Sequence, residues 1–134
     1  MDFATHVLRL LPGQDLKKSL HHFVSEHNME AVTVLMGMGS LTQACVRLAQ
    51  DKEGRLFSKQ YEILTLMGTA SKSGGLHLHI SLADATGAVM GGHLMEGSLI
   101  FTTAEITLLE HKNKKFIREP DAQTGYLELK VLNQ

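Results

Sequence analysis

Three histidines, His77, His79 and His93, have the residue type and the spacing to bind a metal ion. Apolar side chains alternate with the first two, and this period of two predicts a β-strand over residues 76–82. Residues i and i+2 of a strand point to the same face, about 6–7 Å apart. Two imidazoles at this spacing can reach one ion at a Zn–N distance of about 2.0–2.1 Å.

The third histidine joins the pair only in one hairpin register. The sequence Asp-Ala-Thr-Gly at residues 84–87 is typical of a three-residue loop whose glycine adopts the left-handed conformation. In that register His79 lies opposite His93, and His77 lies opposite Met95, so the three histidines share one face. A two-residue loop would turn His93 to the other face, so the metal hypothesis requires the glycine bulge or an equivalent shift.

Three neutral imidazoles leave a fourth coordination position open, which is typical of catalytic or ligand-exchanging zinc. We predict zinc, although another divalent transition metal such as nickel, copper or iron also suits such a site. Glu62, Asp84 and Glu96 are candidates for the fourth position or for groups beside it, and the spacing does not select among them. We would test Glu62 first as a catalytic residue.

The plainer interpretation is that the histidines are only polar residues on a solvent-facing sheet. The presence of a third histidine in the hairpin favours the metal-binding interpretation over this one.

The elements that position this hairpin are mostly strands. Residues 15–27 predict an amphipathic helix, because Asp15 suits an N-cap and apolar residues recur at helical spacing from Leu16. Further strands are predicted at residues 7–11, 31–36 with a continuation over 41–49, 61–67 closed by Gly68, 88–95, 98–109 and 126–132. Residues 112–115 are predicted to be a charged loop. We predict one α+β domain over residues 1–134, a β-rich sheet with one clear helix.

Composition narrows the function classes. The chain has 134 residues, 13 basic and 14 acidic, and a net charge of −1, which does not favour a protein that coats nucleic acid by charge. A single cysteine excludes an intramolecular disulfide and suits a reducing compartment. We find no signal peptide and no apolar stretch of about 18 residues, so a cytoplasmic protein without a membrane partner is expected, with the nucleus left open.

Several segments together resemble the plants-and-prokaryotes-conserved (PPC) domain. They cover nearly the whole chain: residues 37–41, 61–69, 75–84 with its His-Leu-His, 87–94 with its Gly-Gly-His, and 102–106. The resemblance implies a homotrimer built on a largely antiparallel mixed β-sheet flanked by one or two helices, with metal at His77, His79 and His93. Plant members of the family add an AT-hook that binds the DNA minor groove. This chain has no Arg-Gly-Arg-Pro segment, so nucleic acid is not expected as a partner on its own.

Three functions follow from these observations. The first is a zinc-binding homotrimeric module that acts through self-association and protein partners. The second is a zinc-dependent enzyme acting on a small oxo-acid bound at the metal, because the metal hairpin is also distantly similar to that of acetolactate decarboxylase. The third, a DNA-associated regulator, has the least support. The sequence leaves open whether the chain is an enzyme, and we rank the first function highest.

Overall fold

Strands make up most of the molecule, and one helix accompanies them. The computed structural model describes residues 2–134. Its elements are β1 (Phe3–Leu10), α1 (Leu16–Glu26), β2 (Val32–Arg47), β3 (Arg55–Phe57), β4 (Tyr61–Ser71), β5 (Gly75–Ala83), β6 (Val89–Leu94), β7 (Leu99–His111), β8 (Lys114–Pro120) and β9 (Leu127–Asn133). The fold is α+β and dominated by sheet, which confirms the predicted class.

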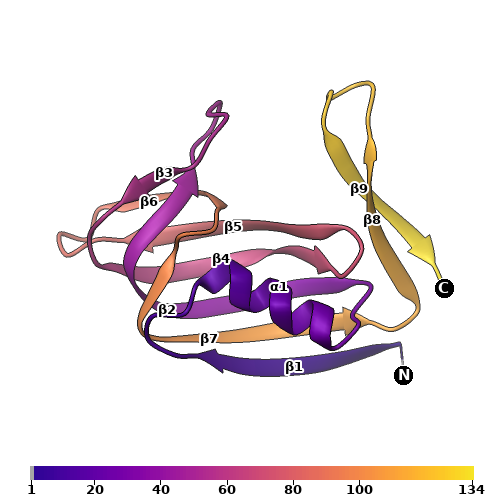
Figure 1. Cartoon of the computed structure of the whole chain (residues 1–134), viewed down its shortest axis with the longest axis horizontal. Helices are drawn as coiled ribbons and strands as arrows, with labels where there is room; N and C mark the ends of the chain where they lie inside the picture. Colours follow the sequence, from indigo (N-terminus) through magenta and orange to yellow (C-terminus); the bar gives the residue numbers. More distant parts are fainter. Residues whose placement is uncertain (1) are drawn as a thin grey trace.

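The main sheet follows the order β1-β7-β2-β4-β5-β6, and β3 pairs with β2 beside it (Figure 1). Each pairing in the described part of the chain is antiparallel. The long strand β2 pairs with β7 and β4 along its length and with β6 near its end. That last pairing brings the far edge of the sheet back to β2, so β6 is held from two sides.

Helix α1 covers one face of the sheet (Figure 1). Asp15 caps it as predicted, because its carboxylate accepts a hydrogen bond of 3.0 Å from the Lys18 amide. Leu16, Leu20 and Val24 are fully buried and form the core with apolar residues of the sheet. The hydrophobic core therefore lies between the helix and one face of the sheet.

The strand from residue 31 continues to Arg47, as expected, through register shifts between Val34 and Gln43. The predicted end of the next strand at Gly68 was wrong, because β4 continues to Ser71. Gly68 has a φ of 148°, and a Cβ there would lie 2.1 Å from the carbonyl oxygen of His77. The glycine therefore permits close approach of the neighbouring strand rather than ending its own.

The β8–β9 hairpin forms a separate two-stranded sheet that projects from the main sheet (Figure 1). Residues 114–115 belong to β8, so the predicted charged loop at 112–115 is only partly a loop. Buried Phe116 attaches the hairpin: its amide donates to the Glu30 carbonyl at 2.8 Å, and its carbonyl accepts from the Ser71 hydroxyl at 2.7 Å. This anchor holds the hairpin beside the start of β5.

No helix within residues 2–134 has both the length and the apolar character needed to cross a membrane.

Candidate metal centre

The turn between β5 and β6 has the predicted three-residue form. Asp84 pairs with Ala88 through a hydrogen bond of 3.0 Å from the Asp84 amide, and the Gly87 amide donates to the Asp84 carbonyl at 2.9 Å. Gly87 has a φ of 82°, in the left-handed region. The register follows, with His79 paired to His93. The structure confirms the predicted register at the two residues that matter most for the site.

Asp84 stabilises this turn rather than the histidine cluster. Its carboxylate accepts hydrogen bonds from the Lys59 ammonium at 2.8 Å, the Thr86 hydroxyl at 2.6 Å and the Thr86 amide at 2.9 Å. These bonds, that from Lys59 foremost, hold the pKa of Asp84 well below its usual range. The Asp84 carboxylate therefore stays negatively charged near neutral pH and accepts these hydrogen bonds.

The predicted pairing of His77 with Met95 was wrong. The β5–β6 ladder ends at the His79–His93 pair. Beyond it β6 pairs with β2, where Arg47 lies opposite His93, and the Met95 amide donates to the Cys45 carbonyl at 3.0 Å. This second partner draws the end of β6 away from β5. His77 pairs instead only with Thr69 of β4.

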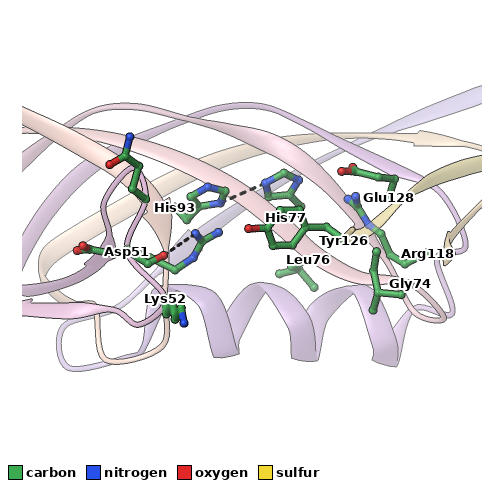
Figure 2. A pocket seen from close by; sticks show the side chains of 12 residues that line it. Asp51, Lys52, Gly74, Leu76, His77, His93, Arg118, Tyr126 and Glu128 are labelled. Carbon is green, nitrogen blue, oxygen red and sulfur yellow. Dashed lines mark hydrogen bonds between the residues drawn. The ribbon is translucent and has the colours of Figure 1, made fainter. Parts of the chain in front are cut away.

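The three histidines nevertheless form one cluster. One ring nitrogen from each lies within 4.8 Å of those of the other two. Nε2 of His77 lies 3.2 Å from Nδ1 of His93, and Figure 2 shows these two rings facing each other. Their planes are nearly parallel, at 11°, whereas the His79 ring stands at 75° to that of His93. Two nitrogens bound tetrahedrally at about 2.0–2.1 Å from a zinc ion are about 3.3–3.4 Å apart, close to the separation observed.

The surroundings favour neutral imidazoles, the form that binds metals. Burial lowers the pKa of His77, and the nearby Arg118 guanidinium lowers it further. Burial also lowers the pKa of His93, with Arg47 as the next cause. Two guanidinium groups on different strands therefore act on the cluster from two sides.

The three carboxylates proposed from the sequence lie away from the histidines of the same chain. Glu62 is exposed on β4 and paired with Ala83, four residues along β5 from His79, which corresponds to about 13 Å. Asp84 lies in the turn, and Glu96 lies 3.8 Å from the Lys18 ammonium. The structure does not bring Glu62 into the cluster.

Other polar residues share a cavity of about 870 Å³ with His77 and His93. Three of them lie on strands: Arg47 on β2, Arg118 on β8 and Glu128 on β9. Figure 2 shows Arg118 and Glu128 on the hairpin side of His77. Sequence reasoning missed all three because each comes from a strand far from the histidines along the chain. A charged residue within a predicted strand was the only signal at Arg47 and Glu128, and Arg118 gave none.

The fold and the cluster define a class, the sheet-dominated α+β proteins with a candidate three-histidine metal centre on a hairpin. Residues 1–112 match the Plants and Prokaryotes Conserved (PCC) domain, so the chain belongs to this family. The resemblance of its motifs to that family is thereby confirmed.

Individual relatives agree with this membership. A Synechococcus bifunctional protein GlmU is 50% identical over 124 residues, which are 92% of this chain and 20% of that protein. The chain thus spans about a fifth of the length of this relative and of a second Synechococcus protein that it matches. A hypothetical protein from Salmonella enterica has a structure with a TM-score of 0.96 and 34% identity, covering 98% of this chain and 95% of that one. A metal-containing protein from Archaeoglobus fulgidus has a TM-score of 0.80 and 27% identity, covering 95% and 93%.

Proposed function

We propose that this chain is a zinc-binding module in which His77, His79 and His93 hold one ion. The observation that carries the proposal is the convergence of one nitrogen from each ring within 4.8 Å. The metal-containing relative from Archaeoglobus fulgidus supports a metal at this fold. An all-imidazole set suits zinc, and the separation of the His77 and His93 nitrogens, 3.2 Å, fits tetrahedral ligands.

We propose further that the module is a homotrimer that acts through self-association and protein partners. The sheet face opposite α1 supports association, because it exposes Leu35, Met36, Met38, Leu64 and Met67. They lie on residues 35–38 of β2 and 64–67 of β4, between the pairs Val34–Gly68 and Gly39–Ile63. Soluble monomers rarely expose a contiguous apolar patch of this kind.

A second candidate, a zinc-dependent enzyme acting on a small oxo-acid, is favoured by the cavity beside the histidines. Its volume of about 870 Å³ lies within the range of small-ligand sites, and it contains the carboxylate of Glu128. An ion held there would polarise a carbonyl or activate water. Turnover of an oxo-acid in a substrate screen, lost in Glu128→Gln with the metal retained, would favour this function. A DNA-associated role has no comparable support, since the net charge is −1.

The metal proposal is tested by cobalt substitution. Co²⁺ bound tetrahedrally gives intense visible absorption, whereas hydrated Co²⁺ does not. We expect metal-free protein to bind one Co²⁺ per chain with this spectrum, and zinc to displace it. His93→Ala should lose the spectrum, while His21→Ala, an exposed helix residue, should keep it. Weak absorption that no histidine variant alters would contradict the proposal.

A further inference from the structure

The cavity beside the histidines is positively charged by groups that have no acidic partner. Arg47 lies directly opposite His93 in the β2–β6 pairing. Arg118 donates a hydrogen bond of 2.9 Å to the Thr69 hydroxyl, and Thr69 lies opposite His77. Both arginines line the cavity. The two guanidinium groups therefore flank the histidine cluster on two sides.

Neither guanidinium is neutralised by a carboxylate. Across residues 2–134, no ion pair includes Arg47 or Arg118. Arg47 donates instead to the backbone carbonyl of Asp51 at 3.2 Å, while the Asp51 carboxylate pairs with Arg55 at 2.7 Å. Both side chains are half-buried rather than extended into solvent. Arginines placed in this way retain free donors for an anion.

Adding a divalent ion increases this imbalance. Neutral imidazoles contribute no negative charge, so an ion held by three histidines keeps its full double charge beside the two arginines. Glu128 is the one acidic side chain of the cavity, among the described residues, that forms no ion pair. A ligand carrying two negative charges would offset most of this excess positive charge, and the planar fork of arginine matches a carboxylate.

We propose that this cavity binds a small dicarboxylic 2-oxo acid. One carboxylate oxygen of its oxo-acid end coordinates the ion at the position that the histidines leave open, and Arg47 and Arg118 neutralise its two carboxylates. This inference rests on the metal site proposed above and names the ligand class of that site. Arg118 and Glu128 lie beyond residues 1–112, the part that matches the family, so the hairpin supplies this selectivity.

Two acids of equal length test the proposal on the zinc-loaded full chain. 2-Oxoglutarate and 2-oxovalerate each have five carbons and the same oxo-carboxylate end, and only the first has a distal carboxylate. By calorimetry we expect 2-oxoglutarate to bind about tenfold or more tightly than 2-oxovalerate, the value of a charge-assisted pair. Inorganic phosphate, as a general anion, should bind more weakly than 2-oxoglutarate.

Two arginine variants test which residues cause the preference for 2-oxoglutarate. Arg118→Gln and Arg47→Gln should each weaken binding of 2-oxoglutarate by about tenfold while keeping zinc. Arg9→Gln is the matched control, because Arg9 also donates to a threonine, Thr103 at 3.0 Å, but lies on β1 away from the cavity. It should bind as the wild type does.

The outcomes separate this inference from the metal proposal. If the wild type holds no zinc, the metal proposal fails and the ligand inference fails with it. If zinc is bound but the two acids bind equally, or phosphate binds as tightly as 2-oxoglutarate, the ligand inference alone is overturned. The comparison of acids uses the wild type, so it is decisive even if an arginine variant folds poorly.

Discussion

Glu110 links the edge strand β1 to its neighbour β7. This buried carboxylate on β7 accepts a hydrogen bond of 2.7 Å from the Lys112 ammonium and lies 2.9 Å from Nε2 of His6 on β1. Burial by itself would raise the pKa of Glu110, but the bonds from Lys112 and His6 outweigh it. The pKa of Glu110 therefore lies below its ordinary value of 4.5.

This shift predicts a pH dependence of stability. Because the folded-state pKa is lower than the unfolded one, the contribution of Glu110 is present above pH 4.5 and is lost as the pH falls through the lower folded value. Glu110→Gln should cost about 1–2 kcal/mol at pH 7, and the difference from the wild type should shrink below pH 4.5. Urea unfolding of the metal-free proteins measures both the loss of stability at pH 7 and its decrease below pH 4.5.

Glu119→Gln is the control for this prediction. Glu119 is half-exposed and pairs with Lys130 at 2.9 Å, so its loss should cost less than about 0.5 kcal/mol. If Glu110→Gln lowered the free energy of unfolding by the same small amount at pH 7 and below pH 4.5, the buried carboxylate would contribute nothing to stability.

At the scale of elements, the β5–β6 hairpin decides whether three histidines or two share a face. Gly87 at a φ of 82° closes the loop that pairs His79 with His93. No atom lies within 4 Å of a Cβ added at Gly87, so a larger side chain there meets only a conformational cost. Substitution of Gly87 therefore tests the β5–β6 register without introducing a steric clash.

We expect Gly87→Val to lose about 1–2 kcal/mol in urea unfolding, because a β-branched residue strongly disfavours the left-handed conformation. Its zinc affinity should fall as well, since the register is weakened. Gly87→Asn should lose little of either, because asparagine tolerates that conformation. Equal stability and zinc affinity for the valine and asparagine variants would mean that this loop does not fix the register.

Local chemistry explains why this hairpin was predictable from sequence. The alternation around His77 and His79 and the turn at residues 84–87 lie within a few positions of one another. The errors depend on distant partners: β2 captures the end of β6, and the His77 carbonyl comes up to Gly68 from the neighbouring strand. A glycine in the sequence signals a break and a close approach equally well, and only the neighbouring strand decides.

At the scale of the molecule, one face of the sheet is covered by α1 and the other exposes apolar side chains. Met38 is 50% exposed and Met67 54%, and Met67 pairs with His79. The apolar surface thus reaches the histidine cluster. Covering this surface by other copies of the chain would place the proposed metal centre next to an interface.

We expect the wild type to have a mass of about 44 kDa in light scattering, three chains of 14.8 kDa. Met38→Glu should shift it toward a single chain, because an interface core disfavours a charge. His21→Glu, exposed on the helix at the opposite face, should leave the mass unchanged. A wild type that runs as a single chain at micromolar concentration would contradict the proposed trimer.

The residues that line the cavity together with the histidines could not be predicted from the sequence. Arg47 lies in a predicted strand segment, whereas no strand was predicted around Arg118, and the two residues are 71 positions apart. They reach the histidines because β2 pairs with β6 and because Phe116 attaches the C-terminal hairpin beside β5. Glu62, the carboxylate singled out from the sequence, lies elsewhere on β4.

The central claim is that three histidines hold one ion, and the metal content of untagged protein tests it most directly. Wild type, His79→Ala and His22→Ala would be supplied with zinc, dialysed and compared by elemental analysis. His22 is an exposed helix residue and serves as the control. We expect about one zinc per chain in the wild type and in His22→Ala, and almost none in His79→Ala, which loses one of three ligands. A wild type without zinc, or a His79→Ala variant that keeps it, would contradict the account.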